Sequence, residues 1–352
     1  MPFLNAADII FEDNFDFLDL SKWQHEITLA GGGNWEFQMY HNNRSNSYVH
    51  DNTLFIKPTL MADYTSAGES FLWTGQVDLW GGADADYCTN NDYYGCSRVG
   101  TGTNYLNPAI SARIRTLQSF TFKYGKVTFQ AKMPKGDWLW PAIWLMPAKN
   151  AYGGWPSSGE IDIVESRGNV RMECYGGRLD VSCISSNLHW GPRYEYNQYE
   201  KTGGEICKND GTDFNTKFSE FEMEWTETYI QTKVDGEVIM RASPTEAGYS
   251  SFWDYGQFPG GLDNPWKYNS PMAPFDQEFY LIFNVAVGGT NGFFPDGCVN
   301  YGSGAKPWNN QSPTAPRDFW NAHNAWYDQT WDKYGENDAL QIKNLKVYSY
   351  EN

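Results

Sequence analysis

Apolar and polar residues alternate along many parts of the chain, as they do in β-strands with one face in a core and the other in water. Residues 127–133 (VTFQAKM) show this alternation most regularly. In 229–242 two such runs flank Asp235-Gly236, a pair typical of a two-residue hairpin turn. We expect strands or hairpins in seven segments: 53–58, 109–116, 124–133, 218–226, 229–242, 278–289 and 340–350.

Helical periodicity is nearly absent from the 352 residues, and only 316–328 has a pattern that fits a turn or two of helix. Long segments rich in Gly, Asn, Tyr and Trp separate the strands, and loops of this length usually have a function. We expect loops at 75–108, 171–212, 250–277 and 292–335. The pattern predicts an all-β fold, a sandwich of two antiparallel sheets with long loops, as one domain over 1–352.

Three carboxylates interrupt a strand-like run in 158–168 (SGEIDIVESRG). In a regular strand Glu160 and Asp162 share a face, whereas Glu165 points to the opposite face. A β-bulge near 163–164 would return Glu165 to the side of the other two acids. The carboxyl groups of the two glutamates could then lie roughly 5–6 Å apart, the separation found in retaining glycosidases.

An acidic, solvated strand face without chemistry is the alternative interpretation of these carboxylates. The preceding segment, 137–147 (DWLWPAIWLMP), favours the catalytic interpretation, because Trp138, Trp140 and Trp144 have the same parity and so share one strand face. Tryptophans in a core are the simpler explanation for any one of them. Three in register beside an acidic strand favour a platform on which sugar rings stack.

The balance of charges narrows the class of ligand. Asp and Glu number 43 against 26 Lys and Arg, which gives a net charge of −17. This field repels nucleic acids, anionic membrane surfaces and acidic substrates, so we expect a neutral or cationic ligand. No run of about 18 apolar residues predicts a membrane span. The first 16 residues lack the pattern of a signal peptide, which fits either a cytosolic protein or a mature secreted form.

The six cysteines favour the secreted form. None has the C-x-x-C spacing of a metal site, and buried thiols are the alternative to disulfides. Short sequence distances predict two bridges and leave one long-range pair: Cys88–Cys96, Cys174–Cys183 and Cys207–Cys298. Disulfides persist in oxidising compartments, so we expect an extracellular protein.

Four blocks of the sequence together resemble glycoside hydrolase family 16: 111–147, GEIDIVESRGN at 159–169, NLHWG at 187–191 and LIFNVAVGG at 281–289. Within that family the chain is most similar to the β-1,3-glucanases (laminarinases) of invertebrates and bacteria and to insect β-glucan recognition proteins. The resemblance extends from FEDNFD at 11–16 to the last strand. It implies a concave β-jelly-roll, a substrate groove and retaining hydrolysis that needs no cofactor.

The resemblance also implies roles for individual residues. Glu160 matches the family's nucleophile, Asp162 its assisting acid and Glu165 its acid/base. His189 matches a histidine on a neighbouring strand that supports the catalytic centre.

Trp140 and Trp144 match the sugar-stacking pair of the W-P-A-x-W motif, and Arg115 and Asn34 match polar groups near the glycone subsites. Many relatives have an aspartate in the last strand that helps to bind a structural calcium. Lys343 stands at that position here, which argues against the calcium.

Two functions of different classes follow. The first is a secreted endo-β-1,3-glucanase, acting as a monomer on laminarin-type glucans. The second is a non-hydrolytic β-1,3-glucan recognition protein of innate immunity.

Relatives of the second kind have lost one or both catalytic glutamates and usually have an additional N-terminal carbohydrate-binding module. Both glutamates are present here and the sequence begins directly with the hydrolase segment, so we expect the enzyme without a separate binding module. A lectin would leave the spacing of the acids unexplained.

Overall fold

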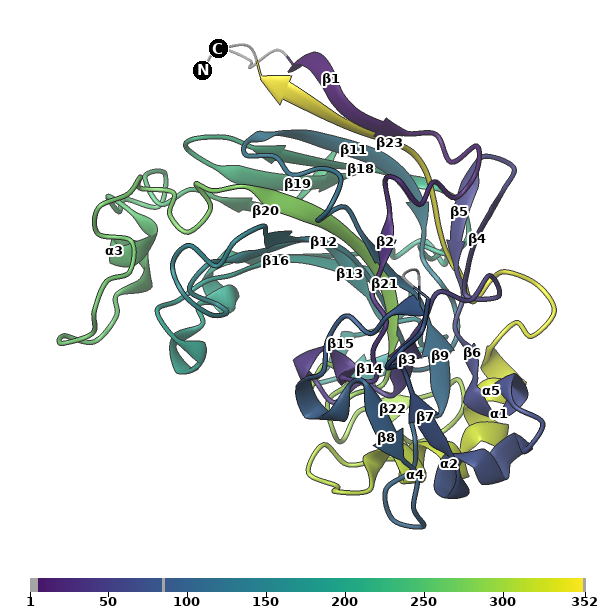
Figure 1. Cartoon of the computed structure of the whole chain (residues 1–352). Coiled ribbons are helices and arrows are strands. Elements are labelled where there is room, and N and C mark those ends of the chain that lie inside the picture. The colour runs from purple at the N-terminus through teal and green to yellow at the C-terminus, as the bar shows by residue number, and fades with distance from the viewer. Residues whose placement is uncertain (1–5, 84–85, 351–352) are drawn as a thin grey trace.

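The computed structural model describes residues 6–83 and 86–350, which form two antiparallel sheets packed face to face (Figure 1). The outer sheet contains β1 (Ala6–Asp13), β4 (Ser47–His50), β5 (Thr53–Ile56), β11 (Gly125–Lys132), β18 (Ser219–Trp225), β19 (Ile230–Val234), β20 (Glu237–Ala242) and β23 (Leu340–Tyr350). Its strand order is β20-β19-β18-β11-β23-β5-β4, with β1 paired to β23. The all-β sandwich predicted from the sequence is confirmed.

The inner sheet has the order β17-β16-β13-β12-β21-β10-β2. Its strands are β2 (Gln24–His25), β10 (Arg113–Arg115), β12 (Leu139–Pro147), β13 (Glu160–Ser166), β16 (Cys183–His189), β17 (Gly203–Cys207) and β21 (Phe279–Val287). In Figure 1 both sheets curve in the same direction. All nine residues of the central strand β21 are buried, so this strand is covered on both faces.

Smaller elements lie outside the two main sheets. The short strands are β3 (Gln38–Tyr40), β6 (Thr59–Leu60), β7 (Gln76–Asp78), β8 (Ser97–Val99), β9 (Ala109–Ser111), β14 (Met172–Cys174), β15 (Gly177–Arg178) and β22 (Val299–Asn300). The helices are α1 (Met61–Tyr64), α2 (Phe71–Thr74), α3 (Phe252–Gly256), α4 (Ala315–Asn321) and α5 (His323–Thr330). The helical turns expected in 316–328 are therefore α4 and α5. Within the described residues, no helix has the length and hydropathy to cross a membrane.

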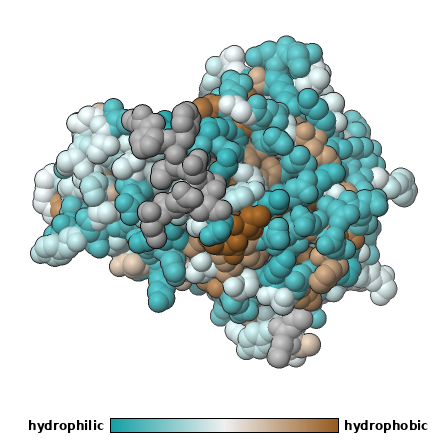
Figure 2. Space-filling model, turned by 90° about the horizontal axis from the view of Figure 1, so that it is seen from above, coloured by the Kyte–Doolittle hydropathy of each residue, from teal (hydrophilic) through white to brown (hydrophobic). Residues whose placement is uncertain are grey.

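The alternation in the sequence separates the core from the outer surface. In β11, Val127, Phe129 and Ala131 are buried against the inner sheet, while Lys126, Thr128 and Gln130 remain partly exposed. The face seen from above in Figure 2 is accordingly mostly hydrophilic, with hydrophobic areas that are small. The seven expected strand segments all contain strands, and the hairpin turn at Asp235-Gly236 connects β19 to β20.

The expectation of a loop without strands is wrong for three segments. Segment 75–108 contains β7 and β8, 292–335 contains β22, and 171–212 contains β14, β15 and, in the inner sheet, β16 and β17. In β16 the core face includes Ser186 beside Ile184 and Leu188, and the other face has Ser185, Asn187 and His189. Few apolar residues therefore mark this strand in the sequence. Strand pairing, more than hydrophobicity, defines it.

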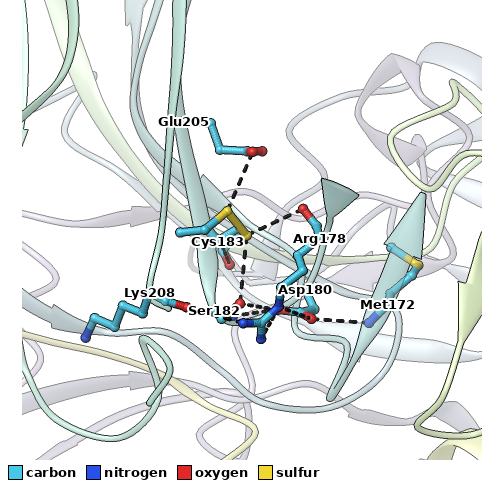
Figure 3. Close-up of a disulfide and its surroundings, with 9 residues drawn as sticks. Met172, Arg178, Asp180, Ser182, Cys183, Glu205 and Lys208 are labelled. Carbon is cyan, nitrogen blue, oxygen red and sulfur yellow. Dashed lines mark hydrogen bonds and ion pairs between the residues drawn. A yellow bond between two sulfur atoms is a disulfide. The ribbon is translucent and has the colours of Figure 1, made fainter. Parts of the chain in front are cut away.

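Two of the three predicted disulfides are also wrong. Cys88–Cys96 is confirmed, but the other bonds are Cys174–Cys298 and Cys183–Cys207. Cys183 and Cys207 are opposite residues of β16 and β17, with Cα atoms 4.1 Å apart (Figure 3). Cys174 ends β14, which pairs with β22 directly after Cys298. The sheets bring distant cysteines together, so distance along the sequence is a poor guide here.

The residue at the position of the family's calcium ligand does not fit a calcium site. Lys343 lies on β23, and its ammonium group is 4.0 Å from the centre of the Phe218 ring. A cation packed on an aromatic face supplies no oxygen ligand, which calcium requires.

Candidate active site

The register of the inner sheet arranges side chains in rows across its concave face, because opposite residues of paired strands project to the same side. One row contains Arg113, Asn284, Ala142, Glu165, Ser185 and Glu205. The next row contains Gln24, Arg115, Ile282, Trp144, Asp162 and Asn187. Four of the predicted site residues therefore lie in these two rows, although they come from distant parts of the sequence: Arg115, Trp144, Asp162 and Glu165.

A β-bulge in β13 places the three acids on this face. Ile143 of β12 is opposite Val164, whereas the next residue, Trp144, is opposite Asp162, so Ile163 is the additional residue. The pairing of β13 with β16 shifts between Asp162 and Glu165 as well. The bulge expected near 163–164 is confirmed, and the hydrophobic residues of β13 are buried while Glu160 and Glu165 remain partly exposed.

His189 lies between two of the carboxylates. Its Nε2 is 3.3 Å from Oδ2 of Asp162 and 3.8 Å from Oε1 of Glu160, and its Nδ1 is 2.8 Å from the Asn197 side-chain amide. Burial lowers the pKa of His189, but the charge of Glu160 and the hydrogen bond to Asp162 outweigh burial and raise it to about 9. The neighbouring carboxylates therefore favour the protonated imidazole, whose charge offsets part of the negative charge of the cluster.

The second oxygen of Glu160 has a partner that no motif in the sequence predicts. Trp155 Nε1 donates a hydrogen bond of 2.9 Å to Glu160 Oε2. Trp155 lies in the loop before β13, about one third exposed, and its ring is 5.4 Å from the His189 ring. This indole fixes the carboxylate of Glu160 from the solvent side.

Asp162 and Glu165 are in an environment that favours their protonated forms. Burial, followed by the charges of Glu160 and Glu165, raises the pKa of Asp162 well above its usual range. Burial also raises the pKa of Glu165, although the hydrogen bond from Trp140 and the charge of His189 oppose this shift. Trp140 Nε1 donates to Glu165 Oε1 over 2.8 Å. Both carboxyl groups thus favour the protonated form, and the hydrogen bond from Trp140 opposes this shift at Glu165.

Trp140 and Trp144 both lie on the concave face, but their surroundings differ. Trp144 is partly exposed, donates to Asn284 Oδ1 over 2.7 Å and has the Arg113 guanidinium 4.6 Å from its ring centre. Trp140 is only 7% exposed, and Phe293 stacks on it at 3.8 Å with an interplanar angle of 7°. Trp144 is therefore the more accessible of the two rings for a sugar.

Trp138 is not part of this face, and the prediction that it belongs to the platform is wrong. The residue is 1% exposed and packs edge-to-face on Phe294 and Trp308. Its φ of +71° lies outside the extended region, and β12 begins only at Leu139. The alternation that relates Trp140 to Trp144 therefore does not extend back to Trp138.

Arg115 lines two cavities that lie farther along the concave face than the acids. Its Nε donates to Gln24 Oε1 over 2.9 Å and its Nη1 to Glu26 Oε1 over 3.0 Å. One cavity of about 290 Å³ lies over β21, β10 and the end of β2, and a second of about 640 Å³ lies over β2, with Thr89 and Arg115 shared between them. The groove therefore continues past the Trp144 region to the edge of the sheet.

Asn34 lies at the rim of this groove rather than on its floor. It donates to Glu36 Oε1 over 2.9 Å and accepts from Asn291 over 3.1 Å. Glu36 is buried and also accepts from Gln38 Nε2 over 2.6 Å. Asn34 thus takes part in a polar cluster with the buried residues Glu36 and Gln38.

Comparisons with known proteins agree with this geometry. Residues 86–261 match the family model Glycosyl hydrolases family 16. The chain is 50% identical over 348 residues to the β-1,3-glucan-binding protein of Penaeus monodon, covering 97% of this chain and 90% of that protein. It is 32% identical over 298 residues to glucan endo-1,3-β-glucosidase A1 of Niallia circulans, covering 82% of this chain but 35% of that protein. The laminarinase from Rhodothermus marinus has a similar fold, with a TM-score of 0.58, 21% identity and 98% of both chains covered. The chain belongs to glycosyl hydrolase family 16.

Proposed function

We propose that this protein is a secreted endo-β-1,3-glucanase that hydrolyses laminarin-type glucans with retention of configuration. The observation that carries the proposal is the bulge in β13, which brings Glu160, Asp162 and Glu165 to one face in unequal environments. A retaining glycosidase needs two carboxyl groups in different protonation states.

In the proposed mechanism Glu165 donates its proton to the glycosidic oxygen, and Glu160 attacks the anomeric carbon to form a glycosyl-enzyme. Glu165, now ionised, then takes a proton from water as the water releases the sugar. The imidazole of His189 and the N–H of Trp155 hold the carboxylate of Glu160 in place. Asp162 lies between the two glutamates in β13, and its Oδ2 is 3.3 Å from His189 Nε2.

The continuous groove supports internal cleavage. The cavities over β21, β10 and β2 extend the concave floor several strands away from β13. Neighbouring strands are about 4.8 Å apart, so the floor extends roughly 19 Å from β13 to β2. A floor of this length accommodates several sugar residues of a chain on one side of the cleaved bond.

A second candidate function is glucan binding without hydrolysis. The observation in its favour is the 50% identity to a protein named β-1,3-glucan-binding protein. The same groove and Trp144 serve both functions, so only the chemistry at Glu160 and Glu165 separates them. The three disulfides support an extracellular location for either function.

The test is reducing-sugar release from laminarin, curdlan, lichenan, agarose and carboxymethylcellulose, measured side by side, with the anomeric configuration of the first products followed by NMR. We expect internal cleavage of laminarin and curdlan and β-configured products. Binding of laminarin without release of any sugar would support the recognition function instead.

A further inference from the structure

Three side chains from different parts of the chain form a stack behind Glu165. The Arg167 guanidinium lies 3.9 Å from the centre of the Phe293 ring. The Phe293 ring also stacks on the Trp140 ring, with the ring centres 3.8 Å apart and an interplanar angle of 7°. Trp140 in turn donates its indole N–H to Glu165. The order Arg167, Phe293, Trp140, Glu165 thus connects a cation to the proposed acid/base through two aromatic rings.

Arg167 is held firmly in this stack. It follows the last residue of β13, and its Nε donates to the backbone carbonyl of Phe293 over 2.7 Å. Burial lowers the pKa of Arg167 to about 10, opposed by the charges of Glu165 and Glu205, so the guanidinium stays charged at neutral pH. The same arginine therefore fixes Phe293 by its ring face and by its main chain.

We propose that Arg167 and Phe293 are positioning residues, which hold the indole of Trp140 against Glu165 and thereby orient the carboxyl group toward the glycosidic oxygen. This inference rests on the proposed role of Glu165. A Trp side chain has two rotatable bonds, and a parallel ring on one face restricts both. Misplacing a catalytic group by about 1 Å can cost roughly 10²-fold in rate.

The fixed positive charge has a second consequence for Glu165. The charged or titratable groups that act on this carboxyl are Glu160, Asp162, His189 and Arg167. Arg167 and His189 lower the pKa of Glu165, whereas Glu160 raises it. Removing the charge of Arg167 should therefore raise the pKa of Glu165. The acid is active while protonated, so the alkaline limb of the kcat/KM profile should move to higher pH.

Four variants separate the two effects: Arg167→Met, Arg167→Lys, Phe293→Leu and the control Arg171→Met. Arg171 is an exposed arginine whose guanidinium lies 4.6 Å from the Tyr301 ring, outside the groove. Measurements are kcat and KM on laminarin across pH, and the pKa of Glu165 by NMR of protein labelled with ¹³C at glutamate carboxyls. The Glu165 resonance is assigned by its loss in Glu165→Gln.

We expect Arg167→Met to shift both the alkaline limb and the Glu165 resonance to higher pH. Arg167→Lys should leave the alkaline limb near its original position but lower kcat, since lysine keeps the charge and loses the planar stack. Phe293→Leu should lower kcat by more than about twofold and by up to roughly 10²-fold, with little change in KM. Arg171→Met should match the unmodified protein.

An unchanged Glu165 pKa in Arg167→Met, together with kcat within twofold in folded Phe293→Leu, would overturn the inference. If Arg167→Met does not fold, the inference is tested by the kcat values of Arg167→Lys and Phe293→Leu. Values within twofold of the unmodified protein would then overturn it. If the unmodified protein releases no sugar, the proposed function fails. The NMR titration then still decides whether Arg167 acts on Glu165.

Discussion

The acids of β13 illustrate how much a single residue's surroundings determine its chemistry. The spacing E-x-D-x-x-E and the bulge that it requires could be predicted from parity alone. The partners Trp155, Arg167 and Phe293 could not, because each reaches the acids through loop geometry rather than through strand alternation. Only their aromatic or cationic character would have drawn notice, and these types are common along the chain.

Replacing Glu165 by glutamine should abolish hydrolysis while preserving binding. The amide keeps the shape of the side chain but has no acidic proton, and general acid catalysis typically contributes about 10²–10⁴-fold. Sugar release and laminari-oligosaccharide binding by calorimetry are the two measurements. Glu220→Gln, an exposed residue of β18, is the control. Near-normal hydrolysis by Glu165→Gln would remove Glu165 from the mechanism.

His189 should make the stability of the protein depend on pH. The pKa of His189 is raised from 6.5 to about 9 in the folded protein, so its charged form stabilises the fold below about pH 6.5, and this contribution is lost as pH rises to about 9. We expect the Tm difference between the unmodified protein and His189→Gln to be larger at pH 6 than at pH 9.5. A difference that is equal at both pH values would contradict the charged state of His189.

At the scale of elements, the sequence pattern predicted most strands of the outer sheet and also β10 and β21 of the groove, but it failed for β16 and β17. β11 is evident in the sequence because every second residue from Val127 to Ala131 is apolar. β16 is less evident, because its concave face consists of Ser185, Asn187 and His189. The same failure explains the disulfides: without β16 and β17, the pairing of Cys183 with Cys207 has no basis in the sequence.

Peptide mapping under non-reducing conditions tests this pairing of strands. We expect fragments that join Cys183 to Cys207 and Cys174 to Cys298, in addition to the Cys88–Cys96 loop. The Cα atoms of the first two pairs are 4.1 and 4.6 Å apart, close enough for bonds between neighbouring strands. Recovery of a Cys174–Cys183 fragment would contradict the register of β16 with β17.

Trp138 and Trp144, six residues apart, provide a matched test of core against groove. Trp138→Ala should destabilise the protein by about 3–5 kcal/mol, as is typical for a buried aromatic residue. Trp144→Ala should cost less stability but weaken binding of laminari-oligosaccharides, and kcat should fall if this subsite helps to distort the sugar. Thermal midpoints and calorimetric binding are compared for both. Equal losses of stability with unchanged binding by Trp144→Ala would place Trp144 in the core.

For the whole molecule, fold class and family could be predicted from the sequence, because they depend on the hydrophobic pattern and on contiguous motifs. The residues of the concave floor could not all be predicted from the sequence. Arg113, Asn284 and Ser185 lie on this floor only because distant strands pair with one another. The net charge of −17 agrees with a neutral glucan as ligand. Charge alone does not distinguish a hydrolase from a binding protein, and the experiments on Glu165 are needed for that distinction.

The cystine between β16 and β17 has a consequence for how the protein behaves when it is reduced. β17 is an edge strand of the inner sheet, and the strand at the other edge, β2, has only two residues. An unpaired edge is a template for strands of other molecules. Loss of the Cys183–Cys207 bond would free β17 to separate from β16, exposing a longer edge that includes the strand of His189. Reducing conditions should therefore promote self-association of the folded protein through this side of the groove before they unfold the sandwich.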